Sequence, residues 1–339
     1  MNYFNDNLKL NRIIASIVLA FSFMVYFLTM APTVSYWDCG EFIATSYILG
    51  VPHPPGSPLY LLLGRIFSMI PTNPDIAFRV NIISPIVSAV ACMLLYLIIV
   101  KIILQWRGKI KNNTDLLIAF GGALVGSLTF AFTDSHWFNA VEAEVYAMST
   151  FFTAIVVWLI LLWSENADND GSERYILIIA YMFGLAIGVH ILNLLTLPFL
   201  ALIIYFRKTN FDWKTFFITM GLTATVFLVI HNGIIKGLPR MSKLIGLEGV
   251  GLLVIITFAV VIWAIKNKQQ LLSLIFTSII LILVGYSSYA TIFIRSGQDP
   301  MIDENDPETI SRAISYLERE QYGAIGQLPR KYIKNKVGT

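Results

Sequence analysis

The chain has 339 residues, of which 56% are hydrophobic and only 13% carry a charge. Soluble globular chains carry about 25% charged residues, so this composition is typical of a membrane protein with several spans. The net charge of +3 is too small to indicate a nucleic-acid partner. The two cysteines, Cys39 and Cys92, define neither a disulfide framework nor a thiolate metal site.

The first apolar stretch, residues 13–31, follows Lys9 and Arg12. Its Thr29-Met30-Ala31 ending resembles a signal-peptidase site, so a cleaved leader is one interpretation. The stretch is close to the roughly 20 residues that cross a bilayer, and further apolar stretches follow it. The sequence therefore favours a first helix that is retained as a membrane span.

Apolar stretches of this kind recur along the chain and predict an all-α polytopic membrane protein with about nine spans. The fifth and sixth are short and meet at His190, so they could instead form one kinked segment. The predicted spans lie near 13–31, 78–100, 116–133, 144–163, 175–189, 191–206, 215–231, 244–265 and 270–294.

Lysine and arginine concentrate in alternate connections between these stretches, which places those connections in the cytoplasm. The N-terminus is then inside, the C-terminus is outside, and the chain is expected in the inner (cytoplasmic) membrane. Every histidine falls at or near the outer face under this assignment, and so do several carboxylates. The clustering predicts a single polar site that faces the periplasm.

The outer connection from residue 32 to 77 is long enough to carry structure of its own. Asp38 to Leu49 reads as a short helix with one polar edge. The stretch from Pro52 to Pro58 cannot be helical throughout, because proline removes a donor and restricts the preceding residue. Leu59 to Ile70 reads as an apolar helix that lies in the membrane interface.

The composition changes sharply after Ile294. Asp306 is a candidate N-cap with Pro307 at the first helical position, and the helix is expected to run to about Tyr322. Residues 1–295 are expected to form the membrane domain, and residues 296–339 to begin an extracytoplasmic tail of a larger protein.

Asp38 and Glu41 are the leading candidates for chemistry, because two carboxylates three residues apart share one face of a helix. Transfer of a sugar to a hydroxyl needs a base for the acceptor proton, and a carboxylate can serve. We assign that role to Asp38, with Glu41 holding the acceptor, a metal or a second proton. The alternative is that Asp38 only caps the helix and Glu41 faces water.

His53 lies between Pro52 and Pro54, which stiffen its backbone. It is a candidate for phosphate binding, proton transfer or metal ligation, or it packs on Trp37 or Tyr36. A divalent cation stays open as a cofactor, because no strong ligand set is present. No EF-hand loop, P-loop or Rossmann glycine pattern occurs in the sequence.

A second group of candidates begins the fourth predicted span. If this segment is helical, Glu142 and Tyr146 share a face and Glu144 is turned about 160° from Glu142. Glu142 with Tyr146, or Glu144 alone, would bind sugar hydroxyls. The alternative is that both glutamates are simply solvated.

Three further polar residues are candidates for substrate binding. His190 and Asn193 lie three apart within apolar sequence, where they either contact substrate or hydrogen-bond between helices. Arg295 ends the last span, where a guanidinium suits bidentate phosphate binding or lies in the headgroup region.

Several motifs resemble one family, the bacterial domain of unknown function 2723, which is related to eukaryotic transmembrane protein 260. They are Trp37-Asp38-Cys39-Gly40-Glu41-Phe42, His53-Pro54-Pro55-Gly56, Leu63-Gly64-Arg65, Glu142-Ala143-Glu144-Val145-Tyr146 and Asp303-Glu304-Asn305-Asp306-Pro307. The resemblance implies the GT-C membrane fold and protein O-mannosyltransferase activity. It also implies a polyprenyl-phosphate-linked sugar donor, a secreted or envelope protein as acceptor, and a first-loop carboxylate, here Asp38, as base.

Two other functions compete with this prediction. A transporter or flippase of a lipid-linked sugar would need similar contacts to an anionic headgroup, but it should place polar groups near the bilayer midplane. A scaffold for an envelope assembly complex would leave Asp38 and Glu41 without a role. The polar residues gather at one face beside a long loop, which favours a glycosyltransferase with mannose as one candidate sugar.

Overall fold

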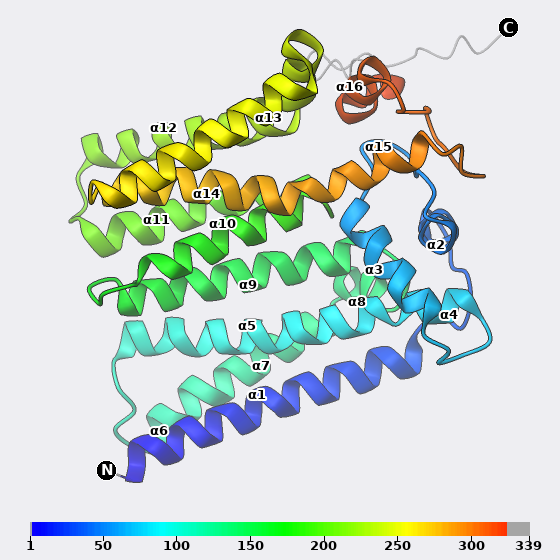
Figure 1. Cartoon of the computed structure of the whole chain (residues 1–339). Coiled ribbons are helices and arrows are strands. Elements are labelled where there is room, and N and C mark those ends of the chain that lie inside the picture. The colour runs from blue at the N-terminus through cyan, green and yellow to red at the C-terminus, as the bar shows by residue number, and fades with distance from the viewer. Residues whose placement is uncertain (1, 324–339) are drawn as a thin grey trace, which may run out of the picture.

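The computed structural model describes residues 2–323, with side chains from residue 7. Within this part every regular element is a helix, and the β-structure is limited to an isolated bridge between Val51 and Asp303. Figure 1 shows the long helices packed side by side, with the N-terminus at one end of the bundle. The predicted all-α polytopic fold is confirmed.

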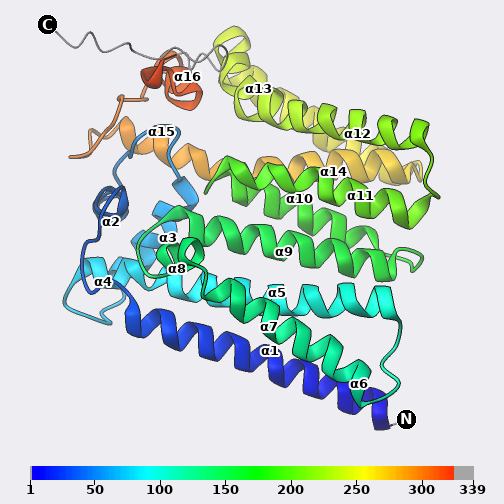
Figure 2. The ribbon, with the colours of Figure 1, turned by 180° about the vertical axis from the view of Figure 1, so that it is seen from behind.

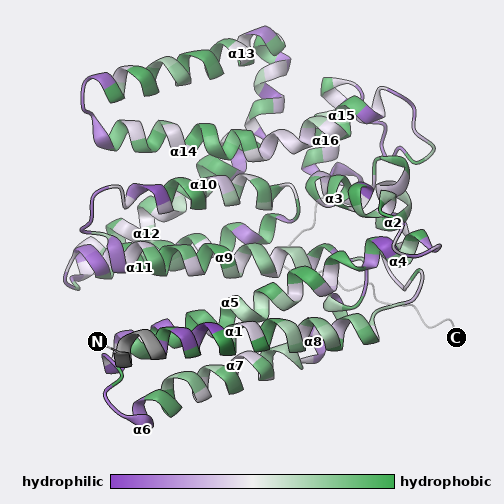
Figure 3. Ribbon diagram, turned by 60° about the horizontal axis from the view of Figure 1, so that its bottom comes forward, coloured by the Kyte–Doolittle hydropathy of each residue, from purple (hydrophilic) through white to green (hydrophobic). Residues whose placement is uncertain are grey.

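Eight helical segments in the described part are long and apolar enough to cross a membrane. They are Asn7–Thr29, Ile76–Arg107, Asn113–Ala131, Val145–Asn166, Ile191–Lys208, Trp213–Ile235, Gly237–Lys266 and Gln270–Ser296. Figure 3 shows hydrophobic residues along the lengths of the long helices and hydrophilic residues gathered toward their ends and connections. This distribution matches a bilayer around the middle of the bundle.

The elements are labelled as in Figures 1 and 2. The long helices are α1 (Asn2–Thr29), α5 (Ile83–Arg107), α7 (Gly122–Ala131), α9 (Val145–Asn166), α10 (Glu173–Ile187), α11 (Leu197–Lys208), α12 (Trp213–Leu228), α13 (Gly237–Lys266) and α14 (Gln270–Tyr286). The shorter ones are α2 (Cys39–Ile48), α3 (Pro58–Met69), α4 (Ile76–Asn81), α6 (Asn113–Leu116), α8 (Asp134–Ala140), η2 (Ile191–Thr196), η3 (Val229–Ile235), α15 (Ala290–Ser296) and α16 (Ile310–Glu318).

Helix α10 is too short to count among these eight segments, but it runs between the two ends of the bundle. At one side of the bundle, Arg207 at the end of α11 donates to the carbonyl of Ser164 at the end of α9. At the other side, the rings of Tyr146 and His190 lie 5.1 Å apart. The chain between these sides is α10, whose 15 residues rise only about 22 Å. The two stretches that meet at His190 are therefore separate helices and not one kinked segment.

Helix α10 is short, but it packs closely on α14. Gly184 and Gly285 face each other, and a Cβ added at Gly285 would lie 2.7 Å from the Cα of Gly184. Only glycine allows the two backbones to approach this closely. Helix α10 consequently buries Ile179, Phe183 and Ile187 against its neighbours.

The loop of residues 32–77 folds as the sequence predicts, into helix, turn and helix. Helix α2 ends at Leu49, whose backbone is left-handed (φ +50°), and the proline-rich stretch leads into α3. Phe42, Tyr60 and Leu61 are buried, so α2 and α3 pack onto the ends of the spans. The location of α3 in a membrane interface stays a prediction.

The prediction for the start of the tail helix was wrong. Helix α16 begins at Ile310, and its N-cap is Thr309, whose hydroxyl accepts from the backbone N–H of Arg312. Asp306 has a left-handed backbone (φ +46°), which turns the chain instead of starting a helix. The part of the predicted tail from 324 to 339 lies outside the described residues.

Candidate functional site

Asp38 occupies the N-cap position of α2, but its side chain makes no capping hydrogen bond. The carboxylate is exposed and lines a cavity at the end of the bundle that carries α2, α3 and α16. Figure 1 shows that this end lies opposite the N-terminus. Asp38 therefore stays available for chemistry, and the structure does not show it serving as a simple cap.

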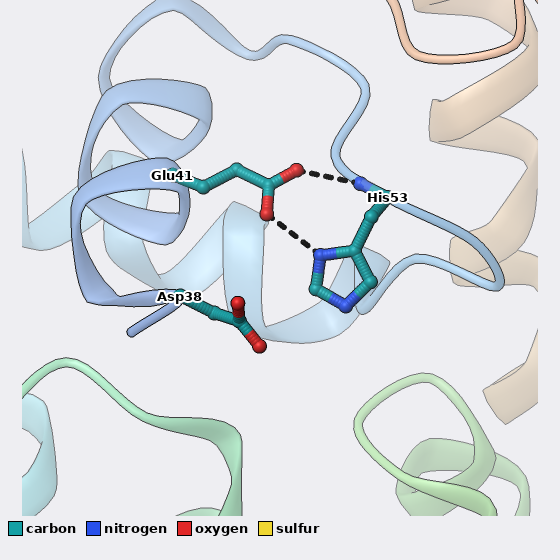
Figure 4. A group of neighbouring side chains, drawn as sticks. All are labelled: Asp38, Glu41 and His53. Atoms are coloured by element: carbon teal, nitrogen blue, oxygen red, sulfur yellow. Dashed lines mark hydrogen bonds and ion pairs between the residues drawn. The ribbon is translucent and has the colours of Figure 1, made fainter. Parts of the chain in front are cut away.

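Glu41 and His53 form a two-point contact, shown in Figure 4. One carboxylate oxygen of Glu41 accepts from the backbone N–H of His53 at 2.6 Å, and the other lies 2.6 Å from its Nδ1. The His53 ring lies next to Phe42, with 5.8 Å between ring centres. The contact thus fixes the position of helix α2 relative to the stiff proline-flanked loop that carries His53.

The ionisation of the pair follows from these contacts. Burial opposes the charge on Glu41, but the hydrogen bonds from the ring and backbone of His53 outweigh it and lower its pKa. The same hydrogen bond, in which Glu41 is the acceptor, raises the pKa of His53 against the effect of burial. An ion pair is therefore favoured between pH 4.5 and 6.5, the ordinary pKa values of the two groups, and it leaves Asp38 as the carboxylate of the motif without a hydrogen-bond partner.

The cavity next to Asp38 has a volume of about 300 Å³. Five of the residues predicted from the sequence line it: Asp38, His53, Glu144, Tyr146 and His190. Glu41 is one contact away through His53. His231 also lines the cavity, as do Lys236 and Arg319, which the sequence prediction did not single out.

The predicted helical relation between Glu142, Glu144 and Tyr146 was wrong. Helix α9 begins only at Val145, and Glu144 is its N-cap, with its carboxylate accepting from the N–H of Val145 at 3.2 Å. Glu142 therefore lies in the preceding turn, so it shares no helical face with Tyr146. Instead, the ring of Tyr146 packs against His190.

The two glutamates have different surroundings. Glu144 is only 6% exposed, and burial, together with the negative charges of Asp38 and Glu142, raises its pKa to about 7. Glu142 lies away from the cavity, where it accepts a hydrogen bond from the Ser35 hydroxyl. Glu144 is thus the glutamate that can present a protonated carboxyl to a ligand at neutral pH.

Asn193 and Arg295 do not line the cavity. The side-chain oxygen of Asn193 accepts from the hydroxyl of Thr153 at 3.1 Å, which joins η2 to α9 as the helix–helix alternative anticipates. Arg295 donates to the backbone carbonyls of Leu49 and Ile48, at 2.7 and 3.1 Å. These carbonyls end α2, so Arg295 holds the helix that carries Glu41.

Asp38, Glu41 and His53 also offer the ligand types that a divalent cation prefers. Their ligand atoms lie within 4.8 Å of one another. Ligands of one Mg²⁺ at 2.0–2.1 Å would lie only about 3 Å apart, so the side chains would have to draw together. Both oxygens of Glu41 already accept hydrogen bonds from His53. The geometry therefore favours the Glu41–His53 contact over a shared metal ion.

Comparison with known proteins adds independent evidence. Residues 38–213 match the family model described as the protein O-mannosyl-transferase TMEM260 N-terminal domain. A protein O-mannosyl-transferase tmem260 from Dictyostelium discoideum is 29% identical over 240 residues, which are 64% of this chain and 27% of that protein. One from Mus musculus is 26% identical over 163 residues, 48% of this chain and 21% of that protein.

No solved structure matches the chain significantly. The aligned regions cover about a quarter of the relatives' length, so the activity of the whole relatives does not transfer automatically. The matched region nevertheless begins at Asp38 and includes Glu41, His53, Glu144 and His190. Because the match covers more than half of its residues, the chain belongs to the family of the TMEM260 N-terminal domain.

Proposed function

We propose that the chain is the membrane domain of a glycosyltransferase. It moves a sugar from a polyprenyl-phosphate donor to a Ser/Thr hydroxyl of a protein, or to a glycan, on the periplasmic side of the inner membrane. The observation that carries this proposal is the free carboxylate of Asp38 at a cavity that also holds cationic side chains. Membership of the family supports it, and the relatives' names make mannose the first sugar to test.

Asp38 accepts the proton of the acceptor hydroxyl as its oxygen bonds to the anomeric carbon of the sugar. The bond from that carbon to the phosphate oxygen breaks, and polyprenyl phosphate leaves with the electron pair. The Glu41–His53 pair fixes the start of α2 and so holds the base in place. Glu144, whose pKa is raised to about 7, can donate a hydrogen bond to a sugar hydroxyl from its protonated form.

The distribution of basic residues supports an outward-facing site. Arg107, Arg207 and Lys266 end spans on the side of the bundle that holds the N-terminus, whereas the cavity lies at the opposite end. Basic residues favour the cytoplasmic side. The polar residues also gather at one end of the helices, whereas a transporter would place its polar residues near the bilayer midplane.

The test is transfer by the purified chain in lipid nanodiscs. Radiolabelled polyprenyl-phosphate mannose is supplied with a Ser/Thr-rich peptide, and covalent label on the peptide is measured. Label on the peptide supports the proposal. Failure with every donor tried, combined with movement of a fluorescent lipid-linked sugar across proteoliposomes, would instead establish the transporter.

A further inference from the structure

Two cationic side chains in the cavity have no role in the chemistry described so far. Lys236 lies at the junction of η3 and α13, and Arg319 follows the last residue of α16. Both line the cavity that Asp38 lines. Among the described residues, neither has an acidic partner within ion-pair distance. The neighbouring Glu318 is already paired with Arg240 at 2.6 Å.

The surroundings of Arg319 show that its position is determined. Its backbone is left-handed (φ +60°) and ends α16, and its N–H donates to the carbonyl of Tyr316 at 3.1 Å. Tyr316 is fully buried, and its hydroxyl donates to the carbonyl of Pro52 at 2.6 Å. The tail helix is therefore fastened to the loop that carries His53.

A second attachment joins the tail helix to α13. The Arg240–Glu318 pair links the helix that follows Lys236 to the end of α16, just before Arg319. The charge of Arg319 also acts on His190, which lines the same cavity: burial lowers the pKa of His190, and the charge of Arg319 lowers it further. Two positive charges at one cavity, neither with an ion-pair partner among the described residues, favour a bound anion.

We propose that Lys236 and Arg319 form the subsite for the phosphate of the lipid-linked donor, so that the segment after the last span is part of the donor site. This inference rests on the proposed function. An ammonium acts on a phosphate as a point charge, and a guanidinium can bind it with two parallel hydrogen bonds. The cations adjoin α13 and α16, whereas Asp38 and Glu144 adjoin α2 and α9, so the phosphate and the base would be held by different elements around one cavity.

The experiment measures binding and not turnover. Radiolabelled polyprenyl phosphate without a sugar is titrated onto the chain in nanodiscs of neutral lipid, for wild type, Lys236→Gln, Arg319→Gln and Arg319→Lys. Losing a charged hydrogen bond should raise the Kd about 10- to 100-fold for each glutamine variant. Arg319→Lys should recover part of the affinity. Polyprenol, which lacks the phosphate, should bind all variants equally.

Lys243→Gln and Arg312→Gln are the matched controls, because they remove the same charges from exposed positions on α13 and α16. Glutamine variants that bind polyprenyl phosphate as tightly as these controls would overturn the subsite and leave the proposed function standing. A wild type that binds no polyprenyl phosphate would overturn both. Displacement of polyprenyl phosphate by anionic phospholipid in the nanodisc would assign the subsite to bulk lipid. Displacement by inorganic phosphate at equal concentration would show that the lipid chain is not recognised. Either result would contradict the inference.

Discussion

Replacement of Glu41 by glutamine removes one charge and almost no volume from the contact with His53. The amide oxygen can still accept from the backbone N–H, but the amide nitrogen then faces Nδ1, which must become an acceptor. His53 is thereby held neutral. A charged hydrogen bond contributes about 1.5–3 kcal/mol, and the pair is partly exposed, so we expect a loss of about 1.5–2 kcal/mol. The side chains of His53 and Glu41 are 28% and 22% exposed.

The pH dependence identifies the ion pair. The pKa of His53 is raised above 6.5, so its contribution is complete below that pH and is lost as pH rises through the raised pKa. The pKa of Glu41 is lowered below 4.5, so its contribution is complete above that pH and is lost as pH falls through the lowered pKa. The stabilisation is therefore largest between 4.5 and 6.5.

The assay is the thermal unfolding midpoint of wild type and Glu41→Gln in one detergent, from pH 5 to 8. We expect a deficit of about 2–3 °C near pH 6 that shrinks toward pH 8. Glu308→Gln, which disturbs only an exposed pair with Arg312, should shift the midpoint by less than about 1 °C. A Glu41→Gln midpoint equal to that of wild type at pH 6, or a deficit independent of pH, would refute the reasoning.

Three further perturbations test other parts of the structure. Burial raises the pKa of Glu144 to about 7, so Glu144→Gln should stabilise the chain by up to about 3 kcal/mol above pH 7. The same variant should remove any step near pH 7 from the pH profile of transfer. An unchanged unfolding midpoint at pH 8 would contradict this. Gly285→Ala should abolish the folded, monodisperse protein in size-exclusion chromatography, whereas Gly221→Ala, which meets nothing within 4 Å, should not. Arg295→Ala releases the end of α2, so it should lower the transfer rate at least about tenfold. The Kd for polyprenyl phosphate should stay within twofold of wild type. An unchanged transfer rate would show that Arg295 does not position α2.

Much of the fold could be predicted because its determinants are local. Runs of apolar residues mark the spans, and the prolines around His53 mark the turn between α2 and α3. The start of α9 could not be predicted in this way. Val141 lies in a turn where its carbonyl accepts from the N–H of Ala31 at 2.8 Å, a contact between residues far apart in sequence. That contact helps hold Glu142 outside the helix.

In the site, too, features that depend on local sequence could be predicted, and features that depend on contacts between distant residues could not. Asp38 and Glu41 stand out because charges are rare in this chain, and their neighbours form a recognisable motif. Lys236 and Arg319 looked like ordinary charges beside a span and in a tail, because only the folded chain brings α16 onto the cavity. Arg295 suggested a phosphate ligand, but its partners Ile48 and Leu49 are almost 250 residues away in the sequence. No local pattern indicates such a pair.

The proposed mechanism depends on Asp38 taking the acceptor proton. Its most direct test is single-turnover transfer from radiolabelled polyprenyl-phosphate mannose to a Ser/Thr peptide by wild type and Asp38→Asn in nanodiscs. Donor binding and thermal unfolding are measured on the same samples. We expect Asp38→Asn to bind donor and melt as wild type does, while the transfer rate falls at least about 100-fold. Transfer by Asp38→Asn at the wild-type rate would contradict the account.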